Sequence, residues 1–174
     1  MCDLDQNSLD NLSNIKQGVL KRRLGMEAQT LKEICSSISI SIDRNKGLPI
    51  VNVVNEENFE INNVSFYIDE VFPFRPPTKI IVNDIEYQAV MLKSYDKTFK
   101  KVLMKLTGYD CLCCQSYVCE SNWAPSVKLT DLVLEIRKMQ AHKKNVEHHI
   151  KLGNLDDNMR DNNIIDDDLK NKIM

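Results

Sequence analysis

The sequence has no hydrophobic run long enough to cross a membrane and no large surplus of either charge. A membrane helix needs about 20 consecutive apolar residues, and no run in the chain approaches that length. Residues 1–18 have neither a basic start nor an apolar core, so we expect no secretory signal. The net charge of -2 gives no indication of a nucleic-acid or anionic-membrane partner. These absences predict a cytoplasmic or nuclear protein whose cysteines stay reduced.

Length and composition predict one globular domain with loose ends. The chain has 174 residues, of which 43% are hydrophobic, enough to build a core. Residues 1–14 are polar, and we expect a flexible N-terminus. Residues 15–152 carry the periodic patterns of a folded domain. Residues 153–174 are acidic and rich in Asn, which predicts a mostly disordered tail.

The first half of the domain changes from a helical to an alternating pattern. Apolar residues recur at helical spacing over 15–35, from Ile15 through Val19 to Leu31, and predict a helix. Period-two and β-rich runs separated by turn residues follow, at 37–44, 47–57, 62–72 and 78–87. We therefore predict one helix followed by a four-stranded antiparallel meander, which is an α+β fold.

The second half contains two further helical patterns. Residues 94–106 alternate an apolar face with four lysines, and Ser94 is the expected cap. This pattern favours an amphipathic surface helix with a solvated lysine face over a docking site for an acidic partner. Residues 126–152 predict a long helix, with Thr130 as its expected cap.

Four of the six cysteines lie in the stretch "CLCCQSYVCESNWAP", residues 111–125. Three interpretations are open: a metal site, a disulfide, or a nucleophile with neighbouring thiols. Reduced conditions disfavour the disulfide. The metal alternative uses the full set of Cys111, Cys113, Cys114 and Cys119, but their spacing is not that of two C-x-x-C pairs. Cys35 lies on the apolar face of the first helix, and we expect it to be buried.

Two proline-containing motifs occur among the predicted elements, one before the last predicted strand and one before the last predicted helix. The run Phe72-Pro73-Phe74-Arg75-Pro76-Pro77 is similar to the Tyr-Pro-Phe-x-Pro-Pro that precedes the fourth strand of the ubiquitin-conjugating enzyme family. The run Trp123-Ala124-Pro125-Ser126 is similar to its Trp-Ser-Pro-Ala, which precedes its second helix. Both occur in the expected order among the predicted elements. The resemblance covers roughly residues 17–140.

The resemblance implies a UBC-like α+β fold and a function. The expected order is an N-terminal helix, a four-stranded antiparallel meander, an active-site loop and a C-terminal helix. A cysteine would take ubiquitin, or a ubiquitin-like protein, from an activating enzyme as a thioester and pass it to a lysine, with a ubiquitin ligase bound. No cofactor, nucleic acid or membrane is implied. The resemblance implies roles in ligase or activating-enzyme binding for Lys21, Arg22, Arg23, Phe74, Ala124 and Pro125.

Three cysteines compete for the role of nucleophile. Cys111 has Gly108 three residues before it and Leu112 after it, as the family pattern has. Cys114 lies at a more usual distance from Trp123, and Cys113 follows an aliphatic residue. We rank Cys111 first, then Cys114, then Cys113.

The family's His-Pro-Asn motif, whose Asn holds the oxyanion, does not occur in the sequence. Tyr87-Gln88-Ala89 stands in its place, and Asn122 or Gln115 is the nearest substitute. Residues 87–110 form an insertion relative to the family's usual spacing and contain the lysine-rich helix. Two alternatives therefore stay open: an inactive UBC-fold adaptor and a zinc-stabilised variant. The richness in Asn, Ile and Lys is typical of an AT-rich genome, such as that of a large DNA virus or a protist.

Overall fold

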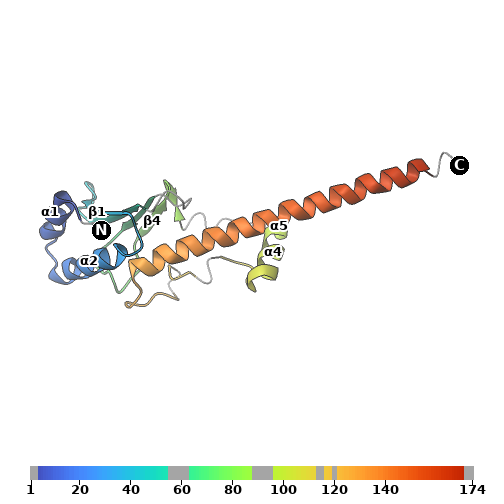
Figure 1. Cartoon of the computed structure of the whole chain (residues 1–174). Helices are drawn as coiled ribbons and strands as arrows, with labels where there is room; N and C mark the ends of the chain where they lie inside the picture. The colour runs from blue at the N-terminus through green and yellow to red at the C-terminus, as the bar shows by residue number, and fades with distance from the viewer. Residues whose placement is uncertain (1–3, 55–62, 88–95, 113–115, 119–120, 171–174) are drawn as a thin grey trace. The chain divides into compact units, whose positions relative to one another are not determined.

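The computed structural model describes residues 4–54, 63–87, 96–112, 116–118 and 121–170, with side chains up to residue 153. These residues form four helices and one five-stranded antiparallel sheet (Figure 1). The predicted α+β class is confirmed. The chain divides into two compact units, which are described separately: Met1–Lys93 with Leu112–Arg137, and Ser94–Cys111 with Lys138–Met174.

The first unit contains two helices, the sheet and the beginning of the long last helix. Its elements are α1 (Gln6–Asn14), α2 (Gly18–Leu31), β1 (Ser37–Ile42), β2 (Pro49–Val54), β3 (Asn63–Tyr67), β4 (Lys79–Val82) and β5 (Ile85–Glu86). Helix α5 (Leu129–Lys170) begins in this unit and continues in the second.

The strands follow one another in chain order, β1-β2-β3-β4-β5, as a meander. The sequence predicted four strands, and the fourth run contains two. Asn83 and Asp84 have φ angles of 46° and 66°, so they make the two-residue turn that joins β4 to β5. Such positive φ angles are typical of the turns that connect hairpin strands tightly.

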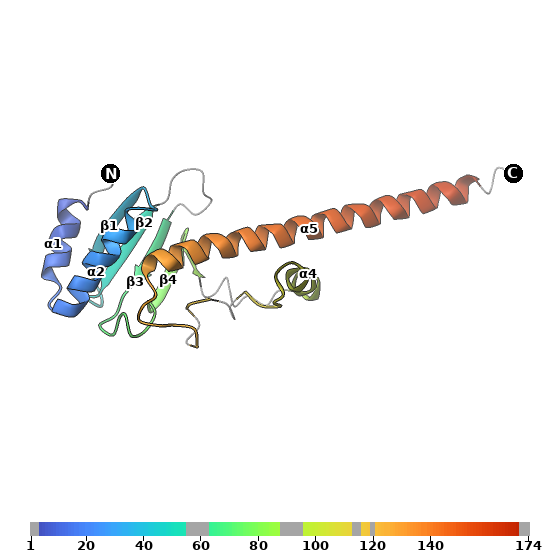
Figure 2. The same cartoon turned by 60° about the horizontal axis from the view of Figure 1, so that its bottom comes forward.

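The core lies on one face of the sheet. Cross-strand partners form a buried row over four strands: Ile40, Val51, Phe66 and Ile80. Helix α2 and the first turns of α5 cover this face (Figure 2). Helix α2 packs through a stripe at helical spacing, which consists of Leu20, Leu24, Ala28 and Leu31. Val19, which the sequence analysis placed on the apolar face, is 71% exposed, because the buried stripe starts one residue later, at Leu20.

Helix α1 contradicts the prediction of a flexible N-terminus over residues 1–14. Asp5 caps it by accepting a hydrogen bond of 2.7 Å from the backbone N–H of Ser8. The Ser8 hydroxyl accepts from the N–H of Ile40 at 2.9 Å, and the Asn11 amide donates to the carbonyl of Ile40 at 2.9 Å. Two of the polar residues that suggested disorder therefore satisfy the backbone groups of Ile40 on the outer edge of β1, the first strand of the sheet in the described part of the chain.

Helix α5 confirms the long helix predicted over 126–152 and extends further than expected. It continues to Lys170, through residues that the sequence analysis assigned to a disordered tail. A helix that is already nucleated adds residues at little cost, so weak helix formers can continue it. Thr130 is not its cap, because its hydroxyl donates to that of Thr30 at 3.1 Å, whereas Asp131 accepts from the N–H of Lys128.

The second unit contains helix α4 (Lys97–Thr107), which corresponds to the amphipathic helix predicted within the insertion. Phe99 and Leu103 are buried. The four lysines on its other face are exposed: Lys97, Lys100, Lys101 and Lys105. Asp96 caps the helix by accepting from the N–H of Phe99, and Ser94, the predicted cap, lies outside the described residues. Within the part of the chain that is described, no helix combines the length and hydropathy that a membrane span requires.

Candidate functional site

The two motifs that carry the resemblance meet in space. The indole Nε1 of Trp123 donates a hydrogen bond of 2.8 Å to the carbonyl of Pro73, which lies 50 positions earlier. The rings of Phe72 and Trp123 are 6.2 Å apart and tilted by 46°. Phe72 is buried, and the Phe72–Pro73 peptide bond is cis. The loop after β3 and the loop before α5 thus form one packed corner of the first unit.

Phe74 projects from this corner into solvent. Its side chain is 70% exposed, whereas Phe72, two residues earlier, is 2% exposed. The Asp69 carboxylate accepts hydrogen bonds from the N–H groups of Val71 and Phe72, at 3.0 and 3.1 Å, and fixes the start of the loop. The loop therefore leaves a large apolar side chain accessible at the position for which the resemblance implies ligase contact. The second predicted contact segment, Ala124–Pro125, is partly exposed and ends in a turn closed by the N–H of Val127 on the Ala124 carbonyl.

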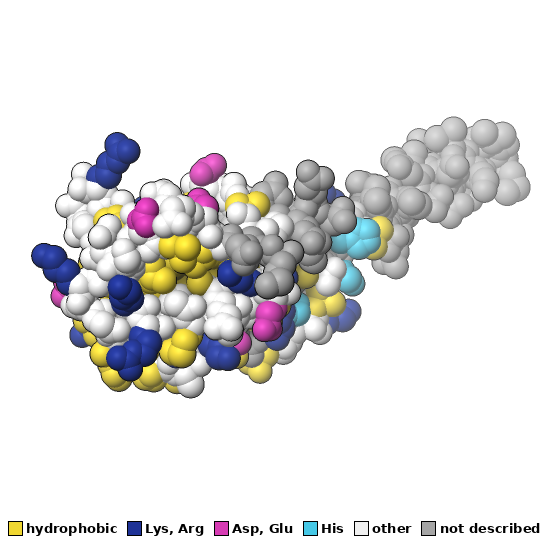
Figure 3. Space-filling model, turned by 60° about the vertical axis from the view of Figure 1, so that its left-hand side comes forward, with side chains coloured by type: hydrophobic (Ala, Val, Ile, Leu, Met, Phe, Trp, Pro, Cys, Tyr) yellow, Lys and Arg dark blue, Asp and Glu magenta, His cyan; other side chains and the backbone are white. Residues whose placement is uncertain are grey.

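The three predicted basic contact residues of α2 do not share one role. Lys21 and Arg22 are exposed, whereas Arg23 turns inward. The Arg23 guanidinium lies 5.7 Å from the centre of the Phe72 ring and donates to the carbonyl of Val127 at 2.9 Å. It therefore ties α2 to both loops of the corner. Figure 3 shows basic side chains scattered singly over one face of the molecule, between apolar and acidic ones, so the coloured residues there form no continuous basic stripe.

A buried carboxylate completes this junction. Oε1 of Glu27 lies 2.7 Å from Nε of Arg23, an ion pair whose N–H is not aligned with the oxygen. Oε2 of Glu27 accepts from the N–H of Leu129 at 2.8 Å, at the start of α5. Burial raises the pKa of Glu27, while the Leu129 N–H and the charges of Arg23 and Lys128 act in the opposite direction.

A second buried carboxylate holds the segment that follows the cysteines. Glu135 of α5 accepts from the Ser116 hydroxyl at 2.5 Å, the Tyr117 N–H at 2.7 Å and the Tyr87 hydroxyl at 3.3 Å. The amide of Asn122 donates to the carbonyl of Ser116 at 3.1 Å. The short run 116–118 is therefore held by hydrogen bonds to two residues, Glu135 of α5 and Asn122 of the following loop.

These contacts involve two residues that were considered as substitutes for the missing oxyanion asparagine or that stand at its motif. Tyr87 occupies the first position of the expected His-Pro-Asn, and it is 4% exposed with its hydroxyl on Glu135. The Asn122 amide is bonded to the Ser116 backbone. Gln115, Gln88 and Ala89 lie outside the described residues. The described residues that could replace the asparagine are thus engaged within the fold.

The predicted nucleophile is described only in part. Cys111 belongs to the second unit, is half-buried and is disulfide-bonded. Cys35 is buried, as expected, and is not part of a disulfide, so the partner of Cys111 lies outside the described residues. The expectation of reduced thiols is wrong for Cys111. Cys113, Cys114 and Cys119, the other members of the predicted nucleophile and metal sets, lie outside the described residues.

Sequence reasoning missed Arg23, Glu27 and Glu135 as organising residues. A signal was present for the two carboxylates. Glu27 follows Leu24 by three positions, and Glu135 follows Leu132 by three, so each falls on the buried face of its helix. A carboxylate within an apolar stripe is buried only where hydrogen-bond donors or cations are available to it, so such a residue indicates a buried polar contact. Among the described residues no cluster of three or more His, Cys, Asp or Glu could hold a metal ion.

No protein-family model matches the chain, and neither the curated proteins nor the solved structures contain a match.

Proposed function

We propose that this protein is a UBC-like domain that carries ubiquitin, or a ubiquitin-like protein, as a cysteine thioester and passes it to lysine amines. The observation that carries the proposal is the contact between Trp123 and the carbonyl of Pro73. It joins the two motifs that resemble the ubiquitin-conjugating enzymes, with Phe74 exposed beside them. The transfer would take place in the cytoplasm or nucleus, with an activating enzyme and a ubiquitin ligase as partners.

The reaction is two successive acyl transfers. A thiolate of the cluster, first Cys111, attacks the thioester carbonyl of ubiquitin on the activating enzyme, whose own thiolate leaves. A lysine amine then attacks the new thioester, and the cysteine leaves as thiolate. Because Cys111 is disulfide-bonded here, the first step needs a reduced cluster. Without an oxyanion asparagine the second step would be slower by roughly 10² to 10³.

The test is a charging assay. The full-length protein, reduced beforehand with a phosphine that is then removed, is mixed with activating enzyme, ATP and ubiquitin, and run on a non-reducing gel. We expect an adduct that disappears with thiol reductant and is absent from Cys111→Ala. Cys119→Ala, in the same cluster, is the matched control and should charge normally. If the adduct persists in Cys111→Ala but not in Cys114→Ala or Cys113→Ala, the nucleophile is reassigned. No adduct after reduction rejects the carrier function.

A second candidate function is a non-catalytic adaptor of the same fold. The observation that favours it is that the two described candidates for the oxyanion donor make hydrogen bonds within the fold, Tyr87 to Glu135 and Asn122 to Ser116. An adaptor would still bind partners through Phe74. Binding that is lost in Phe74→Ala, from a protein that does not charge, would support the adaptor. The control is Val54→Ala, which removes a 39% exposed apolar side chain at the end of β2.

A further inference from the structure

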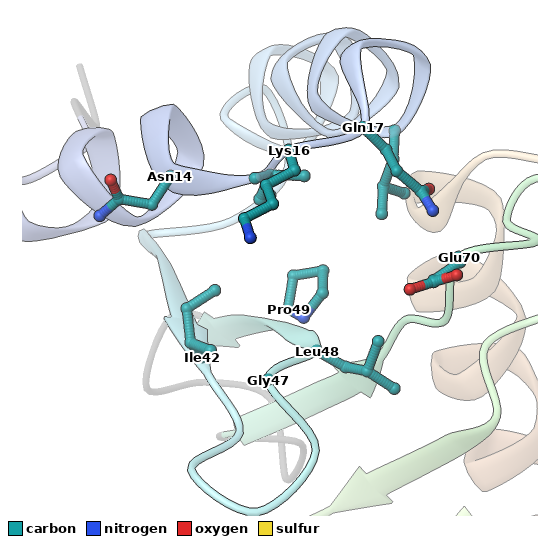
Figure 4. A pocket seen from close by; sticks show the side chains of 10 residues that line it. Asn14, Lys16, Gln17, Ile42, Gly47, Leu48, Pro49 and Glu70 are labelled. Carbon is teal, nitrogen blue, oxygen red and sulfur yellow. The ribbon is translucent and has the colours of Figure 1, made fainter.

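The first unit contains a pocket of about 330 Å³, which shares the loop after β3 with the corner described above (Figure 4). Its walls come from the connection between α1 and α2, from the β1–β2 turn and from the loop after β3. The lining residues are Asn14, Ile15, Lys16, Gln17, Leu20, Ile42, Gly47, Leu48, Pro49 and Glu70. Asn14, Ile15 and Lys16 precede the part of the chain that resembles the ubiquitin-conjugating enzymes.

The pocket has an apolar floor between two opposite charges. Figure 4 shows the Lys16 ammonium pointing into the pocket from the α1–α2 connection, above Pro49. The Glu70 carboxylate points into it from the other side. Both residues are exposed, and neither makes a hydrogen bond or ion pair with the described residues. Both charges are therefore available to a ligand.

Each wall is fixed by its own hydrogen bonds. The α1 wall is held to β1 through Ser8 and Asn11, and the Lys21 ammonium donates to the carbonyl of Ser13 at 3.1 Å. In the β1–β2 turn, the N–H of Gly47 donates to the carbonyl of Asp43 at 2.7 Å, and Gly47 adopts the positive φ of 66° that the turn requires.

The third wall is held in the same way. The Asp69 side chain caps the turn that carries Glu70. A site whose walls are already ordered binds without the entropy loss of arranging them.

We propose that this pocket binds an extended segment of a partner protein, with an apolar side chain in the pocket, an acidic residue against Lys16 and a basic residue against Glu70. Side chains of an extended segment alternate between its two faces. The residues that face the pocket are therefore two apart, in the order acid-x-apolar-x-base or its reverse. The volume of about 330 Å³ lies at the lower end of the range for small-ligand sites and leaves room for an apolar side chain.

The binding would not depend on the cysteine cluster. Its test needs no thioester, and it can succeed or fail independently of the proposed acyl transfer.

The experiment uses the full chain and fluorescein-labelled, acetylated and amidated five-residue peptides, with fluorescence anisotropy as the readout. The mixed peptides are Asp-Gly-Leu-Gly-Lys and Lys-Gly-Leu-Gly-Asp. The comparison peptides carry two Asp, two Lys, or Ala in place of Leu. We expect at least one mixed peptide to bind wild type more tightly than both same-charge peptides, by about two- to fivefold. The Ala peptide should bind more weakly still.

Charge reversal should change the preference. Glu70→Lys should favour the peptide with two Asp, and Lys16→Glu the peptide with two Lys. Lys46→Glu is the control, because Lys46 lies in the β1–β2 turn next to the lining residue Gly47 but does not line the pocket itself. This variant should keep the wild-type preference among the peptides. The peptide series on wild type alone decides the question if a variant fails to fold. The proposal is overturned if neither mixed peptide binds, if the Ala peptide binds as well, or if folded reversal variants keep the wild-type order.

Discussion

The Glu27 carboxylate accepts the backbone N–H of Leu129 across 102 positions of sequence, at 2.8 Å. The bond joins the covering helix α2 to the first residue of α5 inside the core, where Glu27 is 2% exposed and Leu129 is fully buried. An ionised carboxylate at such a position loses its hydration. Leu129, Arg23 and Lys128 stabilise the charged form, but they compensate for the lost hydration only in part, since the pKa of Glu27 remains raised.

This raised pKa predicts a pH-dependent stability. The folded protein takes up the Glu27 proton at higher pH than the unfolded chain does, so the resulting stabilisation is complete below the unfolded pKa, about 4.3. It is lost as pH rises through the folded pKa. In Glu27→Gln the site does not titrate. The free energy of unfolding of wild type minus that of Glu27→Gln should therefore increase as pH falls from 7 toward 4.5, in urea denaturation at several pH values.

The control for this experiment is Glu33→Gln, at an exposed position just after the same helix. Its difference from wild type should stay nearly constant over the same pH range. A Glu27→Gln difference that shrinks as pH falls would contradict the assignment.

Glu135 should control the order of the segment after the cysteine cluster. Glu135→Ala leaves the Ser116 hydroxyl and the Tyr117 N–H without their acceptor, which should cost about 1–3 kcal/mol in free energy of unfolding. Hydrogen exchange of the Tyr117 amide should become faster than that of the β2 amides. Tyr87→Phe removes the 3.3 Å bond to Glu135 alone and should cost about 0.5–1.5 kcal/mol. Unchanged exchange at Tyr117 in Glu135→Ala would show that the loop is held by other contacts.

Trp123→Phe tests the contact between the two motifs. It keeps an aromatic ring near Phe72 but removes the donor to the Pro73 carbonyl, so we expect a loss of about 0.5–1.5 kcal/mol in thermal or urea unfolding. Partner binding through Phe74 should weaken at the same time, because the loop that presents it loses an anchor. Phe74→Ala supplies the opposite pattern, with stability within about 0.5 kcal/mol of wild type and binding lost.

Ser8→Ala should expose the edge of β1. The variant leaves the Ile40 N–H without its acceptor and should lower stability by about 1–3 kcal/mol. It should also increase self-association, measured by sedimentation at rising protein concentration, because an unpaired strand edge is a template for another strand. Ser13→Ala, on the exposed side of the same helix, is the matched control and should self-associate no more than wild type.

The sequence predicted elements that repeat an apolar pattern and missed those built on polar contacts. The alternation of Ile38 and Ile40 and the helical spacing of Leu132 and Ile136 identify a strand and a helix without further information. Helix α1 has no comparable apolar stripe. Its position depends on two hydrogen bonds with Ile40 of β1: the Ser8 hydroxyl accepts from the N–H, and the Asn11 amide donates to the carbonyl. Such contacts between distant residues cannot be predicted from the sequence before the position of the strand is known.

For the candidate site, too, the sequence predicted some residues and missed the role of others. The Pro-rich connector and the Trp123 segment could be identified as motifs, and their exposed member Phe74 follows from the resemblance. The role of Arg23 could not be predicted, because a basic residue beside Lys21 and Arg22 looks like part of a solvated face. Only the fold reveals that its guanidinium lies over the Phe72 ring.

The position of α1 also limits how this domain can meet other proteins. Many domains recruit a peptide by adding it as an extra strand to an open sheet edge. Here Ser8 and Asn11 already occupy the backbone groups of Ile40 at one edge, and the strand at the opposite edge, β5, is only two residues long. Partner binding as proposed above would therefore depend on side-chain contacts in loops and pockets, which discriminate between sequences more than main-chain pairing does.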